Sequence, residues 1–337
     1  MPTTDSLIIC EVMAGIEEGG LENHFCDLAN GLSRKHTVHV IAHPRYRSLL
    51  ADGVVFHPLN LAASRYNPLI LWQLLRTIQA IKPRVIHAHA SKAAAMIGRI
   101  KRFLAQPKVV TVHSVKRSTA MYRAFDRIIA VSGGVAQSLQ PLSAEVIYNG
   151  RALQPLTPVK KNPAKPANVL MIARLVEVKR VDIALRALAQ TTDIHLRIAG
   201  DGALHGALTQ LAKDLGVSER VEFLGFRNDI PDLIQACDAV LISSDREGFP
   251  LAMVESLLLA KPVVSTRVAG AVEFLPQAYL APVGDEHALA QALTRCIHHA
   301  DTCFTDFQNV WQAAAQQLTF EAQLQSTEAV LEQAAGL

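Results

Sequence analysis

Two glutamates, Glu247 and Glu255, stand with seven residues between them in a segment suited to binding chemistry. The preceding stretch, Asp238 to Ile242, has the composition of a buried strand, and Gly248 to Pro250 form a turn into an apolar helix, with Pro250 at a first helical position. Glu247 is therefore expected at the carboxyl end of a strand, and Glu255 one turn or more into the helix, facing the same crevice. Backbone N–H groups at such a helix start attract an anion. The pattern favours a ligand-binding site, although an isolated pair of this kind is more often a helix-start carboxylate and a solvated helix residue.

The elements that must position this pair form an ordered series of strands ending in charged or glycine-rich turns. From about Asn168 to Glu273 the series is Ala173-Arg174-Leu175, Lys179, Ile198-Ala199-Gly200-Asp201-Gly202, Val221-Glu222-Phe223-Leu224-Gly225-Phe226, the Glu247 to Glu255 segment and Pro262-Val263-Val264-Ser265-Thr266. This series closely resembles the donor half of the retaining glycosyltransferases of family four (glycosyl transferases group 1, GT-B type), whose signature is two glutamates flanking seven residues.

The resemblance implies a role for each charged residue. In the family, an Arg and a Lys after the first strand hold the donor diphosphate, so Arg174 and Lys179 are the expected pair. A departing nucleoside diphosphate gathers negative charge, which these cations stabilise more in the transition state than in the ground state. The family's first glutamate contacts the transferred sugar and the second accepts from the ribose hydroxyls, which assigns Glu247 and Glu255. The expected catalytic residues are Arg174, Lys179, Glu247 and His113. The expected donor-binding residues are Gly19, Gly20, Arg174, Lys179, Glu247, Gly248, Phe249, Pro250, Leu251 and Glu255.

Three positions depart from the family pattern, because Ala173, Arg180 and Lys261 stand where glycine is common. None of these changes removes a charged site residue. Ala173 leaves less room for close backbone approach, and Arg180 either adds a phosphate contact or points to solvent.

A glycine loop containing Gly19 and Gly20 follows the first expected strand, Leu7 to Val12. Such a loop lets backbone approach a phosphate or a sugar, but it lacks the G-x-G-x-x-G spacing of a dinucleotide fold. The next strand, Thr37 to Ala42, ends in His43 and not in an acidic ribose ligand, so a hydride-transfer enzyme is disfavoured. The resemblance places the loop glycines at the donor and acceptor crevice, while a simple strand-to-helix connection remains the alternative.

Two further expected strands end in histidine, at His89 and His113. His113 ends its strand at the face where α/β crevices form, and the corresponding family histidine contacts the transferred sugar. His89 is equally consistent with a functional role and with a structural role, in which it is hydrogen-bonded to a neighbouring loop. Glu22 and His89 are the candidate acceptor contacts.

Length and composition define the fold class. A chain of 337 residues with 50% apolar content can bury two cores of about 150 residues each. Strands alternate with helical segments, so each half is expected to be a doubly wound, Rossmann-like α/β domain with a parallel sheet. The resemblance implies that the two domains face a central cleft: an acceptor-binding domain at 1–155, a donor-binding domain at 156–312, and a C-terminal helix at 313–337 that crosses back to the first domain.

Five cysteines without a C-x-x-C pair indicate neither a disulfide framework nor a zinc site, and the expected compartment is the reducing cytoplasm. The sequence shows no apolar run of membrane-spanning length and no secretory signal, so neither is expected. It also lacks the Asp-x-Asp pair with which many sugar transferases of another architecture hold a divalent metal. We therefore expect metal-independent chemistry with no cofactor, the nucleotide sugar being a co-substrate.

Charge differs between the two halves. Residues 1–150 hold 17 Lys and Arg against 9 Asp and Glu (+8), whereas residues 151–337 hold 16 against 21 (−5). The basic first half predicts an anionic partner, such as a phosphorylated glycolipid at an anionic membrane surface. The segment Leu69 to Ile81, with Trp72, is either an interfacial helix or, more simply, a helix packed on the sheet. Nucleic acid is disfavoured because aromatic residues do not interleave the basic ones.

Together these features predict a retaining hexosyltransferase that uses a nucleotide diphosphate sugar, with UDP as the expected nucleotide. Its acceptor would be a hydroxyl of an anionic glycolipid or cell-envelope glycan, such as lipopolysaccharide core, at the inner face of the cytoplasmic membrane. Two alternatives stay open: a nucleotide-sugar epimerase or hydrolase of the same fold, and a non-catalytic nucleotide-sugar-binding subunit.

Overall fold

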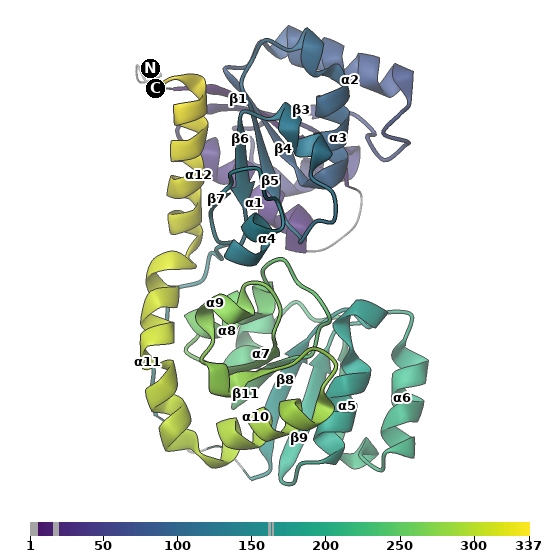
Figure 1. Ribbon diagram of the computed structural model, residues 1–337, viewed down its shortest axis with the longest axis vertical. Helices are drawn as coiled ribbons and strands as arrows, with labels where there is room; N and C mark the ends of the chain where they lie inside the picture. Colours follow the sequence, from purple (N-terminus) through teal and green to yellow (C-terminus); the bar gives the residue numbers. More distant parts are fainter. Residues whose placement is uncertain (1–5, 16–19, 161–162, 164) are drawn as a thin grey trace. The chain divides into compact units, whose positions relative to one another are not determined.

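The structure, a computed structural model, describes residues 6–15, 20–160, 163 and 165–337. The chain forms two compact units (Figure 1). The first takes in the chain up to Tyr148 together with Gln323–Leu337, and the second runs from Asn149 to Ala322. The final helix therefore supplies most of its length to the first unit.

Seven parallel strands form the sheet of the first unit, in the order β3-β2-β1-β4-β5-β6-β7. The strands are β1 (Ile8–Met13), β2 (Thr37–Ala42), β3 (Val55–Pro58), β4 (Val85–His89), β5 (Lys108–Val112), β6 (Arg127–Ala130) and β7 (Glu145–Val146). Their apolar runs suit a sheet covered on both faces. The strand order reverses between β1 and β4, and in such sheets ligands bind at the carboxyl ends of the strands that flank this point.

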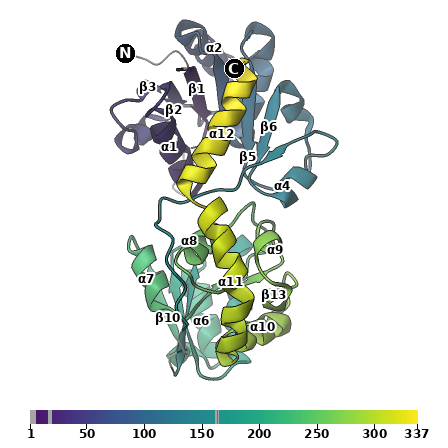
Figure 2. The same ribbon diagram turned by 90° about the vertical axis from the view of Figure 1, so that its left-hand side faces the viewer.

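Helices cover the sheet of the first unit, and the last of them comes from the C-terminal end of the chain. They are α1 (Gly20–Leu32), α2 (Pro68–Ile81), α3 (Ala90–Ile100), α4 (Gly133–Gln137) and α12 (Phe320–Ala335). Helix α12, yellow in Figure 2, places Val330 and Leu331 in the same apolar core as Ile9 and Phe25. Helix α2 buries Leu74 and Ile78, which identifies it as a helix packed on the domain, although Leu69 and Trp72 stay exposed.

Six parallel strands form the sheet of the second unit, in the order β10-β9-β8-β11-β12-β13. The strands are β8 (Ala167–Ile172), β9 (Ile194–Ala199), β10 (Val221–Gly225), β11 (Ala239–Ile242), β12 (Val263–Thr266) and β13 (Leu280–Ala281). The helices are α5 (Val181–Ala189), α6 (His205–Asp214), α7 (Ile230–Ala236), α8 (Leu251–Leu258), α9 (Ala271–Phe274), α10 (Glu286–His298) and α11 (Ala300–Gln317). Here the reversal lies between β8 and β11, so the loops after these two strands are neighbours.

The observed fold confirms the expected class, two Rossmann-like α/β units with parallel sheets. All five cysteines are buried free thiols. Within the residues described, no helix combines the length and the apolar composition needed to cross a bilayer.

Candidate active site

The loop after β8, which carries Arg174, is held in place by two glycines that follow β9. A Cβ atom at Gly200 would lie 2.0 Å from the carbonyl oxygen of Ala173, and one at Gly202 would lie 2.5 Å from that of Leu175. Both distances exclude any larger residue without backbone movement. The glycines therefore let the two loops lie against each other, and Arg174 is exposed to solvent.

Lys179 and Glu247, which come from the loops after β8 and β11, are brought into direct contact. Lys179 Nζ donates to Glu247 Oε1 at 2.6 Å, and the Ser244 hydroxyl donates to the same oxygen at 2.7 Å. The backbone is joined as well, because Ser243 Oγ donates to the carbonyl oxygen of Lys179 at 2.9 Å. Both charged side chains are largely buried, with 23% and 14% of their surface exposed. Residues of both loops therefore hold this ion pair in a fixed position.

The side chain of Arg180, for which the sequence left a phosphate contact or solvent exposure open, is bound to two carboxylates in the structure. Its guanidinium bonds Asp182 and Asp245, each at 3.0 Å, so that its charge is matched by two carboxylates. Its backbone has φ of 46°, in the left-handed region where glycine is least strained. This conformation gives a physical reason for the glycine that is common at this position.

Glu255 lies in α8 and pairs with Arg151, a residue that the sequence interpretation did not single out. Arg151 Nε donates to Glu255 Oε1 at 2.8 Å. Burial raises the pKa of the Glu255 carboxyl, and the guanidinium only partly offsets that rise. Arg151 directly follows the Asn149-Gly150 turn, but nothing in its sequence context points to a partner 104 residues away.

The turn between the two glutamates packs on a glycine. Phe249 is buried, its ring centroid lies 5.8 Å from that of Phe274, and a Cβ at Gly270 would lie 2.5 Å from Phe249 Cδ2. Pro250 occupies the N-cap position of α8 and Leu251 is the first helical residue. The expectation of Pro250 at a first helical position was thus off by one residue, an ordinary uncertainty at helix ends.

In the first unit, a carboxylate and several histidines gather at the carboxyl ends of β1, β4 and β5. The carboxylate of Glu11 is fully buried and bonds His87 Nδ1 at 3.1 Å and His89 Nε2 at 2.6 Å. Burial alone would raise the pKa of Glu11, but the two histidines outweigh it and hold the pKa at about 2. His87 Nε2 lies 2.7 Å from the Thr111 hydroxyl. His89, a candidate acceptor contact, is thus fully buried and bonded to a carboxylate.

His113 follows β5 and lies beside His24 of α1, their ring centroids 5.0 Å apart. Burial lowers the pKa of His113 well below its ordinary value, so the ring is neutral at pH 7. Glu22, the other acceptor candidate, is buried in the first turn of α1. Gly20 begins this helix, and Gly19 lies outside the described residues.

The sequence interpretation missed Glu11, His24 and His87. The sequence did carry a signal for two of them. Glu11 is a charged residue inside an apolar strand, and His87 and His89, at positions i and i+2 of one strand, lie on the same strand face. Their partnership depends on the register of β1 with β4, which pairs Glu11 with His87.

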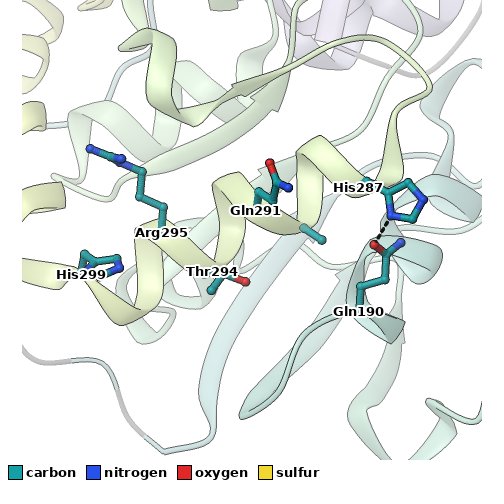
Figure 3. Close-up of a pocket in the computed structure, with 7 residues that line it drawn as sticks. Gln190, His287, Gln291, Thr294, Arg295 and His299 are labelled. Atoms are coloured by element: carbon teal, nitrogen blue, oxygen red, sulfur yellow. Dashed lines mark hydrogen bonds between the residues drawn. The ribbon is translucent and has the colours of Figure 1, made fainter.

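A separate pocket lies on the second unit, lined by Gln190 and by residues of α10 and its C-terminal end, among them His287, Arg295 and His299 (Figure 3). Its volume is about 340 Å³, and His287 Nδ1 bonds Gln190 Oε1 across it. None of the expected site residues lines it, so the carboxyl ends of the strands remain the candidate site.

Comparisons with known proteins identify the family. Residues 156–317 match the family model described as "Glycosyl transferases group 1", and residues 18–154 match "Glycosyltransferase Family 4". Among relatives, the "Lipopolysaccharide core biosynthesis glycosyltransferase LpsE" of Rhizobium meliloti (strain 1021) is 26% identical over 298 residues, 83% of this chain and 86% of the relative. The corresponding LpsD of the same organism is 25% identical over 296 residues, 82% and 84% of the two chains. Among solved structures, Anabaena Alr3699/HepE in complex with UDP has a TM-score of 0.79 and 23% identity, covering 97% of this chain and 100% of that one.

Proposed function

Because the chain belongs to glycosyltransferase family 4, with the GT-B type of fold, we propose that it is a retaining hexosyltransferase that uses a UDP-sugar. The acceptor in this proposal is a hydroxyl of an anionic glycolipid or cell-envelope glycan, such as lipopolysaccharide core. The enzyme would act without a metal at the donor diphosphate, as a cytoplasmic protein bound peripherally to the inner face of the membrane.

The observation that carries the proposal is the ion pair of Lys179 and Glu247 at the point where the strand order of the second unit reverses. In the proposed complex, Lys179 and Arg174 neutralise the donor diphosphate, while Glu247 accepts from hydroxyls of the transferred sugar. Glu255 accepts from the ribose hydroxyls. A lysine already fixed by Glu247 and held by Ser243 needs little reorganisation when charge develops on the leaving group.

The proposed chemistry keeps the configuration at the anomeric carbon. The acceptor oxygen forms a bond to that carbon on the face from which the diphosphate leaves, the bond from carbon to phosphate oxygen breaks, and the acceptor proton passes to a phosphate oxygen. The protein then contributes positioning and stabilisation of the leaving group, and no carboxylate has to attack the sugar.

Two kinds of relative support the donor and acceptor classes. HepE was solved with UDP and with UDP-glucose, and LpsE and LpsD are lipopolysaccharide core glycosyltransferases. The charge of +8 on residues 1–150 favours an anionic acceptor and an anionic membrane surface.

Thermal unfolding in EDTA tests the donor class, with UDP, GDP, ADP and their hexose conjugates as ligands. A ligand at a hundredfold excess over its Kd stabilises by about 2.7 kcal/mol, a shift of several degrees. We expect a shift selective for UDP compounds that is weakened in Glu255→Ala. No shift with any nucleotide would contradict the donor assignment.

Transfer assays separate the remaining classes. With a purified UDP-hexose, we expect product only when a phosphorylated core glycolipid is added, and an α-linked donor should give an α-linked product by NMR. Turnover without acceptor would instead indicate an epimerase or hydrolase, and binding without turnover would indicate a non-catalytic subunit. Equal rates on a neutral soluble glycan would contradict the anionic acceptor.

A further inference from the structure

We propose that His24, His89 and His113 of the first unit form a binding site for a divalent transition metal of the zinc class. The three residues come from α1, from the end of β4 and from the residue after β5. One ring nitrogen from each lies within 4.8 Å of those of the other two. The site adds metal binding to His113, the residue that the family resemblance placed at the transferred sugar, and it lies within a single folded unit.

Two of the three rings present a buried nitrogen that lacks a hydrogen-bond partner among the described residues. These are Nδ1 of His89 and Nε2 of His113. A buried polar atom without a hydrogen-bond partner is destabilising, so two in one cluster indicate a missing ligand. Both rings belong to the same three-histidine group, with centroids 6.0 Å apart.

Glu11 fixes His89 in the form that a metal requires. Because Glu11 Oε2 accepts the N–H of His89 Nε2 at 2.6 Å, the lone pair of His89 is left on Nδ1, the unbonded atom. A carboxylate behind a metal-binding imidazole is the usual arrangement, since it orients the ring and raises its basicity. The side-chain amide nitrogen of Gln323 lies 3.0 Å from Nδ1 and 3.3 Å from Nε2 of His24, so this amide faces the edge of the ring. Rotation of that amide by 180° presents its oxygen to a ring N–H.

The charges of the cluster favour a bound cation. Burial is the main cause that lowers the pKa of His89, to about 4, and burial also lowers the pKa of His113. Metal binding needs neutral imidazole rings, and burial acts in that direction. The buried Glu11 carboxylate adds a negative charge beside them. Lys116 opposes a cation, but it is engaged with the hydroxyls of Ser91 and Ser114.

The ligand type selects the metal. Imidazole nitrogens suit Zn²⁺, Cu²⁺ and Ni²⁺, whereas Mg²⁺ and Ca²⁺ prefer oxygen ligands. In tetrahedral zinc sites with Zn–N of about 2.0–2.1 Å, ligand atoms lie about 3.3 Å apart. Because the ligand nitrogens lie within 4.8 Å of one another, they need to approach by about 1.5 Å at most to reach this spacing. Three histidines leave the fourth position open to water or to an oxygen of a bound molecule.

Metal binding is measured directly on protein stripped with a chelator and dialysed free of it. We expect one equivalent of Co²⁺ per chain, with the visible absorption of a tetrahedral site, displaced by one equivalent of Zn²⁺. His24→Ala and His89→Ala should each lose the absorption and bind at least a hundredfold more weakly. Glu11→Gln should weaken binding by about 10- to 100-fold, because it keeps the shape but removes the charge behind His89.

Two variants serve as controls in the same unit. His57→Ala removes one member of the stacked pair of His39 and His57 and should bind Co²⁺ as the wild type does. Glu328→Gln disrupts the rival group of His36, Glu328 and Glu332 and should also leave binding unchanged. If His24→Ala does not give the wild-type circular dichroism spectrum, His24→Gln replaces it. Absence of stoichiometric binding by the wild type, or wild-type affinity in both histidine variants, overturns the proposal.

Discussion

Arg151 Nε lies 2.8 Å from Glu255 Oε1, so the carboxylate proposed to accept from a ribose already has a cation beside it. The pair joins the start of the second unit to α8, and only 12% of the Glu255 side chain is exposed. Since burial raises the pKa of Glu255, the guanidinium is what favours its ionised form.

Arg151→Met should therefore make nucleotide binding more sensitive to acid. Without the guanidinium, the pKa of Glu255 rises further, and the neutral carboxyl is a poorer acceptor for ribose hydroxyls. UDP binding should weaken as pH falls from 8 to 5.5, and the variant should lose affinity at a higher pH than the wild type. Titration calorimetry across this range checks it, and identical pH profiles would contradict the role given to Arg151. We also expect a loss of about 1–3 kcal/mol in the free energy of unfolding, between the values for exposed and buried pairs.

Lys179→Ala and Arg174→Ala should each lower the rate of transfer by about 10²–10³-fold, because each removes a cation from the leaving diphosphate. The effect should fall on kcat more than on the affinity for UDP-sugar, since charge develops in the transition state. Lys213→Ala is the matched control, a lysine exposed on α6 of the same unit. A near-normal kcat in both Lys179→Ala and Arg174→Ala would contradict a role of these two residues in catalysis.

Gly270→Ala should disturb the turn that carries Glu247. Gly270 has φ of 79°, and its added Cβ would meet the Phe249 ring at 2.5 Å. Gly216→Ala is the control, since Gly216 has φ of 68° and no atom within 4 Å of the added Cβ. Backbone strain alone costs about 1 kcal/mol, so denaturant unfolding should show a larger loss at Gly270. UDP binding should weaken only there. Equal effects of the two substitutions would show that the contact with Phe249 is unimportant.

Glu328→Gln should weaken the docking of α12 in a pH-dependent way. Burial alone would raise the pKa of Glu328, but hydrogen bonds from Lys35 and His36 outweigh it and leave the pKa lowered. Because folding lowers the pKa of Glu328, its ionised carboxylate stabilises the folded state above the ordinary value near 4.5. This contribution to the free energy of unfolding is lost as the pH falls below that value. We expect the variant to be less stable by about 1 kcal/mol at pH 7, and the difference in stability to shrink as the pH falls to 3. A constant difference between pH 7 and pH 3 would mean that the charge of Glu328 is not the cause.

The sequence predicted the fold class and the family because both depend on local patterns. Alternating strands and helices specify a doubly wound sheet, and the two glutamates with their seven intervening residues lie in one continuous segment. The pairs Arg151 with Glu255 and Glu11 with His87 were missed. Each joins residues far apart in the chain, 104 and 76 positions, and no local periodicity reports such a contact. The roles of Arg174, Lys179, Glu247, Glu255 and His113 stay predictions until the experiments above are done.

The place of Val330 and Leu331 in the core of the first unit has a consequence for how the protein is made. A ribosome releases residues 1–148 long before it has synthesised the helix that completes their core, whereas residues 149–322 emerge as a whole. The second unit therefore takes its core from one continuous stretch of chain, while the first keeps apolar surface exposed until α12 has been synthesised. Loss of α12 alone would thus expose the core of the unit whose strands come from the N-terminal half of the chain.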